Sequence, residues 1–409
     1  MLSRPRTPFW RTPLALLAAM SLALVVTVTG CSNVSYYAQA ISGHLAVMRA
    51  AQPIDQVIDD PASDPALKEK LADVQAIRNF ASLALALPDN GSYRRYADLG
   101  RPYVVWNVFA APEFSLQARS WCLLMVGCVN YRGYYDRHDA ERLAAQLRQD
   151  GYDTYVAGVP AYSTLGYFDD PVLNTFLRLG TLEVARTVFH ELAHQQIFVA
   201  GDTSFNESFA TAVEDEGMRR WLATNATPEA RAAFTAQKRR KTELMALLHD
   251  YRQQFVARYG AARSSSEQRD AKAELLAALR RDYAVLKVSW GAYAGYDQFF
   301  GDDLNNAKLA SLSLYSELVP AFAALLEQQN HDLPLFYRRV AALAALDKDA
   351  RRDALQQIVA AAAESRYGAD DQAEGALILA RSGCGACQPD PSSSRRALPP
   401  PAGTVGDRR

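Results

Sequence analysis

The chain has 409 residues, enough for two or three packed units, and its 49% hydrophobic and 22% charged residues are typical of a globular protein. It carries 44 basic and 45 acidic residues, for a formal net charge of −1. This balance gives no indication of the basic surface that a nucleic-acid partner requires, so no nucleic-acid partner is expected, and it leaves the oligomeric state open.

Residues 1–30 have the pattern of an export signal. Arg4, Arg6 and Arg11 precede an apolar run, residues 14–28, which is short for a membrane span. Small residues then lead to Cys31, as in the lipobox of bacterial lipoproteins, where cleavage leaves an acylated cysteine. A plain signal peptide or an uncleaved anchor is the alternative. In lipoproteins of this kind Ser32 implies sorting to the outer membrane, facing the periplasm.

Residues 31–100 are predicted to form a helical N-terminal segment. Residues 34–51 can form one helix, in which His44 has no evident partner and is interpreted as a surface or packing residue. A second helix is expected over residues 65–87, where apolar side chains recur at helical spacing. Asp64 can cap this helix, with Pro65 in its first turn.

Strand-forming residues dominate the next part of the chain, because β-branched and aromatic side chains cluster there. A helix over residues 138–149 interrupts them. We expect a small mixed sheet with a crossover helix, and its predicted strands are residues 103–109, 121–126, 129–135 and 152–156.

Four cysteines remain if Cys31 carries lipid, and an exported protein can hold disulfides. Cys122 and Cys128 flank a glycine in a predicted hairpin and can pair. Cys384 and Cys387 have the C-x-x-C spacing but lie in a tail without strand and helix context. A small local disulfide is therefore favoured there over redox catalysis.

The motif His190-Glu191-Leu192-Ala193-His194 is the most informative stretch of the chain. Residues four apart share one face of a helix, so His190 and His194 can bind one Zn²⁺ through two imidazoles. Glu191 is placed to take a proton from water rather than to bind the metal. The surrounding segment, residues 182–199, has an apolar pattern that predicts a helix.

A catalytic zinc site needs a third protein ligand, and Glu207 is the candidate. It lies in a second predicted helix, which begins near Ser204 after a short loop. The alternative is a capping box, in which Ser204 caps the helix and Glu207 reaches back to a backbone N–H. Glu214 and Asp215 are less suitable substitutes as ligands because they lie farther along.

Tyr162, Ser163 and Thr164 form a polar, strand-capable stretch just upstream of the zinc helix. A sheet edge at this place could bind the backbone of a substrate by strand addition, and an ordinary packed loop is the alternative.

The second half of the chain is predicted to be mostly helical. One of its helices carries Tyr315, whose hydroxyl could stabilise the oxyanion formed in peptide hydrolysis; Asn306 could do the same, and simple packing is the alternative. The predicted helices are residues 228–258, 271–290, 302–326 and 335–346.

The motif at residues 190–195 and the sequence Asn206-Glu207-Ser208-Phe209-Ala210 resemble the gluzincin metallopeptidases. Together with residues 131–135 and 161–168, they make most of the chain similar to the bacterial predicted aminopeptidases, which are often lipoproteins. The resemblance implies zinc, held by His190, His194 and Glu207. No G-x-M-E-N segment occurs, so the position of cleavage stays open.

We therefore expect an α+β, mostly helical fold, in which a zincin-like core with a small mixed sheet is followed by a helical domain. The expected function is a membrane-anchored zinc metallopeptidase that acts on peptides or proteins, with cell-wall peptides or a precursor protein as possible targets. An inactive lipoprotein scaffold is the alternative. The predicted parts are a signal peptide (1–30), a helical segment (31–100), the core (101–226), a helical domain (227–365) and a flexible tail (366–409).

Overall fold

The computed structural model describes residues 34–123, 127–261, 264–312, 318–362 and 364. The chain divides into two compact units, Met1–Gln356 and Gln357–Arg409, and every element named below belongs to the first. Helices predominate and the strands are short, so the expected α+β, mostly helical class is confirmed. Within the described ranges, no helix has the length and apolar character needed to cross a bilayer.

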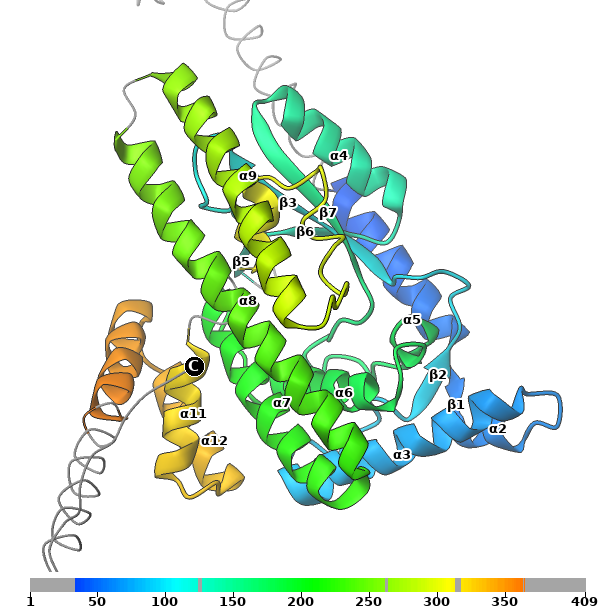
Figure 1. Cartoon of the computed structure of the whole chain (residues 1–409). Coiled ribbons are helices and arrows are strands. Elements are labelled where there is room, and N and C mark those ends of the chain that lie inside the picture. The colour runs from blue at the N-terminus through cyan, green and yellow to red at the C-terminus, as the bar shows by residue number, and fades with distance from the viewer. Residues whose placement is uncertain (1–33, 124–126, 262–263, 313–317, 363, 365–409) are drawn as a thin grey trace, which may run out of the picture. The chain divides into compact units, whose positions relative to one another are not determined.

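A three-stranded antiparallel sheet forms the upper part of the unit in the view of Figure 1. The central strand β3 (Val105–Pro112) pairs with β6 (Arg132–Tyr134) on one side and with β7 (Tyr152–Val159) on the other. Helix α4 (Arg137–Gln149) connects the two outer strands. The expected sheet with a helix between its last strands is therefore present, although every strand pair in it is antiparallel.

Helices cover both faces of this sheet, because successive residues of a strand point to opposite sides. Val108 and Ala110 pack with Ala140 and Ala144 of α4. Their neighbours Phe109 and Ala111 instead pack with two alanines of α10 (Asn306–Leu312), Ala307 and Ala310.

Strands β4 (Trp121–Leu123) and β5 (Gly127–Val129) form a separate hairpin. A disulfide joins Cys122 to Cys128 across it. The predicted single strand over residues 129–135 is wrong, since the chain there is split between β5 and β6.

A second small sheet combines three distant segments, β1 (Gln52–Pro53), β2 (Arg95–Ala97) and β8 (Val172–Leu173). β2 is antiparallel to β1 and parallel to β8. Short helices, α2 (Ile54–Asp59) and α5 (Asn174–Leu177), follow its outer strands.

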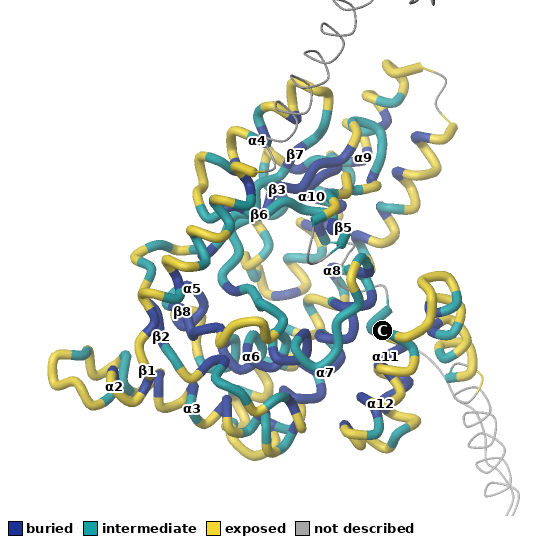
Figure 2. The backbone as a smooth tube through the Cα atoms, turned by 180° about the vertical axis from the view of Figure 1, so that it is seen from behind, coloured by how far each residue is buried: buried dark blue, intermediate teal, exposed yellow. Residues whose placement is uncertain are grey.

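Helix α6 (Thr181–Gln196) lies between α3 (Pro65–Leu85) and α7 (Thr203–Asn225), and its residues are either buried or half-buried, as Figure 2 shows. The predicted cap of α3 is confirmed, because the side chain of Asp64 accepts a hydrogen bond from the N–H of Ala66.

Helices α8 (Pro228–Ala261) and α9 (Ser265–Ser289) form a long pair with its own apolar core. A capping box between Ser264 and Glu267 starts α9, which fixes its beginning six residues before the expected one.

The predicted helix over residues 302–326 is wrong as a single element. The structure has α10 and then α11 (Val319–Gln328), and Pro320 lies in the first turn of α11, where its missing N–H is tolerated. Helix α12 (Leu333–Ala344) follows. Both α11 and α12 contact α7 through aromatic rings, since Phe209 lies against Phe322 and Phe336.

Candidate functional site

Two histidines of α6 lie on one face of the helix, one turn apart. The ring centroids of His190 and His194 are 4.9 Å from each other. The opposite face of α6 fixes their direction, because Val184, Val188 and Leu192 are almost completely buried in the core. The predicted helix and its orientation thus bring both imidazoles to the same place.

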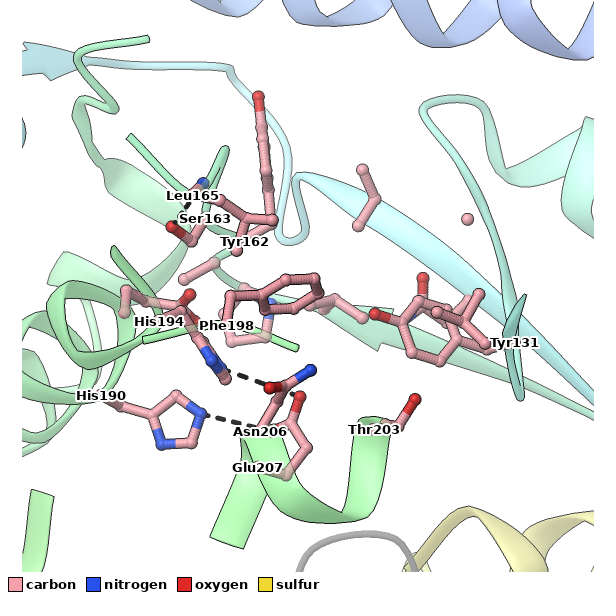
Figure 3. A pocket seen from close by; sticks show the side chains of 18 of the residues that line it. Tyr131, Tyr162, Ser163, Leu165, His190, His194, Phe198, Thr203, Asn206 and Glu207 are labelled. Atoms are coloured by element: carbon pink, nitrogen blue, oxygen red, sulfur yellow. Dashed lines mark hydrogen bonds and ion pairs between the residues drawn. The ribbon is translucent and has the colours of Figure 1, made fainter. Parts of the chain in front are cut away.

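Glu207 reaches the two histidines from α7, as Figure 3 shows. Its carboxylate oxygens lie 3.3 Å from Nε2 of His190 and 3.8 Å from Nε2 of His194. One donor atom from each of the three residues can be chosen so that all lie within 4.8 Å of one another. The two nitrogens and the carboxylate oxygen therefore form a compact group of possible metal ligands.

The short loop between α6 and α7 positions Glu207. The side-chain amide of Asn206 bonds both the N–H and the C=O of Val199, at 2.8 Å each. Asp202 caps α7 by accepting from the N–H of Phe205, and Arg351 donates to the other carboxylate oxygen of Asp202 at 2.5 Å.

Ser204 does not cap α7, so the predicted capping box is absent. Its hydroxyl is buried and makes no hydrogen bond to any described residue. The side chain of Glu207 is therefore directed at the histidines rather than at the start of its own helix.

Glu214 contacts the His190 ring at Nδ1, while Glu207 lies near Nε2, the other ring nitrogen. Nδ1 of His190 lies 3.1 Å from Oε2 of Glu214, and Arg186 donates to the other carboxylate oxygen at 2.7 Å. A proton on Nδ1 of His190 completes this hydrogen bond and leaves Nε2 facing Glu207. Burial raises the pKa of the Glu214 carboxyl, but the hydrogen bond from His190 and the charge of Arg186 outweigh it and hold that pKa low.

The two histidines differ in their electrostatic surroundings. Burial lowers the pKa of His190, but hydrogen bonds to Glu207 and Glu214 reverse the effect and raise it above its usual range. Burial lowers the pKa of His194 to about 4, so this imidazole is neutral at neutral pH. A cation at the three donors would take the place of the proton on Nε2 of His190.

Glu191 lies next to this group without joining it. Burial raises the pKa of its carboxyl to about 7, and the negative charges of Glu207 and Asp170 add to the shift while His190 opposes it. A carboxylate with a pKa near neutrality can both accept and return a proton, which is the property of a general base.

A pocket with a volume of about 600 Å³ opens onto the cluster. Its apolar walls are mainly aromatic and branched side chains: Tyr131, Tyr135, Tyr162, Phe198, Leu123, Val129 and Leu165. Five carboxylates and one guanidinium also line it: Glu183, Glu191, Asp202, Glu207, Glu214 and Arg186. The lining therefore combines apolar side chains with an excess of carboxylates.

The proposed substrate-binding stretch has a different local structure from the expected one. Tyr162 and Ser163 line the pocket, but Thr164 does not; its N–H donates to Asp170. The segment is not a strand: Leu165 and Gly166 adopt positive φ values of 57° and 82° in a turn. The edge of a sheet beside the site is instead β6, since Gly133 lines the pocket.

Tyr315, Cys31, Cys384 and Cys387 lie outside the described residues. Asn306, the other candidate for the oxyanion, has its side chain engaged by Tyr259 and by the backbone of Glu113. It therefore holds α10 in place.

Sequence reasoning missed the part played by Glu214 and the presence of Tyr131 in the pocket. Glu214 is seven residues after Glu207, which puts both on one face of α7, and this spacing could have indicated its place. Burial, together with the charges of Glu207 and Glu191, raises the pKa of the Tyr131 hydroxyl, so that it stays protonated. No local pattern marks Tyr131, because its position depends on the tertiary fold.

A family model described as "Putative aminopeptidase" matches residues 35–355. No curated protein and no solved structure matches the chain. The matched range includes α6, α7 and Arg351, whose guanidinium donates to the Asp202 carboxylate at the start of α7. Since the match spans most of the sequence, the chain belongs to this aminopeptidase family.

Proposed function

We propose that the protein is a zinc-dependent peptidase. The observation that carries the proposal is the convergence of His190, His194 and Glu207, with Glu191 beside them and Glu214 behind His190. Two imidazoles and a carboxylate are a ligand set typical of catalytic zinc, with a fourth position left for water or substrate.

The surroundings of the donors also fit zinc. Ligating histidines usually donate their other ring N–H to a carboxylate, as His190 can to Glu214. Zinc, when bound, polarises a carbonyl and lowers the pKa of water. A purely structural site would be closed by four protein ligands and would need no base, which argues against the inactive scaffold.

Glu191 would act as the general base. Its carboxylate takes a proton from the attacking water and returns it to the amine that leaves when the peptide bond breaks. No covalent intermediate with the protein is required. Tyr131 offers a protonated hydroxyl in the same pocket and replaces Tyr315 as our candidate for binding the carbonyl oxygen in the transition state.

We propose aminopeptidase action on the basis of the family description. Five carboxylates line the pocket, but Arg186 pairs with Glu183 and Glu214, and Arg351 pairs with Asp202. Glu191 and Glu207 remain to attract a positively charged peptide N-terminus, and a bound metal ion would offset part of this attraction.

We further propose that the enzyme works at the cell envelope, held to the outer membrane by lipid on Cys31 and facing the periplasm. The apolar run and the small residues before Cys31 support this placement.

The test is a digest of a peptide library by the purified chain loaded with zinc, read by mass spectrometry. Sequential loss of N-terminal residues, abolished by a chelator and restored by zinc, is the expected result. Cleavage only at internal bonds would overturn the aminopeptidase assignment, and the absence of any cleavage would overturn the peptidase assignment.

A further inference from the structure

The first helix among the described residues, residues 34–50, lies beside the outer edge of β6, and we call it the edge helix. On its other side β6 pairs with β3. At the outer edge, the side-chain amide of Gln39 accepts from the N–H of Tyr135 at 3.1 Å and donates to the C=O of Gly133 at 3.4 Å.

This pair of bonds imitates a neighbouring strand. In a strand, the C=O of one residue and the N–H two positions later point to the same side, where a partner strand would bind them. Gln39 offers one acceptor and one donor to these two groups, as one residue of a partner strand would with its C=O and N–H. The edge of β6 at Gly133 and Tyr135 is therefore already occupied.

One face of the edge helix holds it against β6. The guanidinium of Arg132 lies 4.1 Å from the ring centroid of Tyr36. Gly43 packs so closely on Tyr135 that an added Cβ would lie 2.1 Å from its ring. Nδ1 of His44 is 2.8 Å from the hydroxyl of Tyr162, so the predicted lone histidine has a partner at the pocket wall.

The same residues border the candidate active site. Tyr36 and Ala40 of the edge helix line the pocket together with Gly133 and Tyr135, and the zinc-ligand candidates line the same pocket. An open sheet edge beside a catalytic group is where an extended peptide can bind through its backbone. Here the edge helix closes that edge at one end.

We propose, on the basis of the peptidase function above, that the edge helix ends the substrate groove and restricts the enzyme to the ends of peptides. Gln39 is the specificity-determining residue, because its amide takes the hydrogen-bonding positions that a longer substrate would need. The closed groove selects the ends of peptide substrates by its shape, and no separate motif that binds the substrate amine is needed.

Peptide binding to the full chain, loaded with zinc and carrying Glu191→Gln to prevent turnover, tests the proposal. A linear peptide is compared with its head-to-tail cyclised form, which has no ends. The linear form should bind at least about tenfold more tightly, and the double variant Gln39→Ala/Gly43→Ala should reduce this ratio to below about threefold. Neither change alters the charge of the pocket, so electrostatic preference for an amine stays constant.

Gln146→Ala is the matched control, since Gln146 is an exposed glutamine of α4 that does not line the pocket. This variant should keep the ratio of the parent. Hydrogen exchange adds a second readout: the Tyr135 amide should lose protection in Gln39→Ala and keep it in Gln146→Ala. The single change Gln39→Ala serves if the double variant does not fold.

The proposal is overturned by equal binding of linear and cyclic peptides to the parent, by an unchanged ratio in the folded variant, or by unchanged exchange at Tyr135. Absence of peptide binding to both forms would overturn it as well. Absence of hydrolysis by the chain with intact Glu191 would instead overturn the proposed peptidase function, while the binding ratio would still judge the edge helix.

Discussion

Nδ1 of His190 lies 3.1 Å from Oε2 of Glu214, so a carboxylate two turns along α7 from Glu207 orients the first histidine of α6. Glu214→Gln should lower zinc affinity about 10- to 100-fold, because it weakens the hydrogen bond that fixes the ring and its tautomer. Competition with a chelating dye measures the effect. Asp215→Asn, which changes a neighbouring carboxylate paired with Lys238, should leave the affinity unchanged.

Glu191→Gln should abolish peptide hydrolysis and leave zinc bound. The reason is that Glu191 serves as a base and not as a ligand, and loss of a general base commonly costs about 10²- to 10⁴-fold in rate. Elemental analysis and turnover on the same preparation check both parts. Loss of zinc, or turnover near that of the parent, would contradict the assignment.

Glu207→Ala should lower zinc affinity at least about tenfold, because even changes outside the ligand shell often have effects of this size. Ser204→Ala provides the control, since it removes the hydroxyl that a capping box would use. Zinc titration of both variants separates the two roles of the segment. Equal affinity in Glu207→Ala and the parent would place the third ligand elsewhere.

Asp170 gives the stability of the chain a pH dependence. Burial raises the pKa of its carboxyl from 3.8 to about 6 in the folded protein, although a hydrogen bond from the N–H of Thr164 opposes the shift. The stability contribution of the protonated form is therefore fully present below about pH 4 and is lost as the pH rises through 6.

Asp170→Asn keeps an acceptor for Thr164 and removes the charge. Its free energy of unfolding relative to the parent should increase by up to about 3 kcal/mol between pH 4 and pH 8. Urea denaturation of both proteins with a chelator present measures the difference without a contribution from metal. A difference that does not change with pH would show that Asp170 titrates normally.

Cys31→Ser should release the protein from membranes or block its processing. Metabolic labelling with a fatty-acid analogue should mark the parent and not the variant. If neither protein is marked, the lipoprotein prediction fails.

The zinc-ligand candidates could be found from the sequence because the geometry that joins them is local. His190 and His194 are one helical turn apart, and Glu207 follows after a loop too short to lead elsewhere. Pro320 argues against the predicted single helix over residues 302–326, because a proline fits the first turn of a helix and not its interior. The capping box predicted for Ser204 and Glu207 is absent because Asp202 caps α7 instead.

The walls of the pocket could not be found in this way. Tyr131 reaches the site through the β6 end of the sheet, and Tyr36 through a helix about 150 residues before the histidines. The sequence around Gln39 predicts only a helix, and the contact of its side chain with the β6 segment arises from the tertiary fold. Such contacts depend on which elements pack together, and the periodicity of one segment holds no information about that.

The ion pair between Asp202 and Arg351 can form only late in the synthesis of the chain. Asp202 caps the helix that carries Glu207, and the guanidinium that braces this carboxylate is 149 residues farther along the chain. While the chain is being synthesised, the histidine motif exists well before its brace does. The bond that holds this cap from outside its own helix can therefore form only when nearly the whole matched family range has been made.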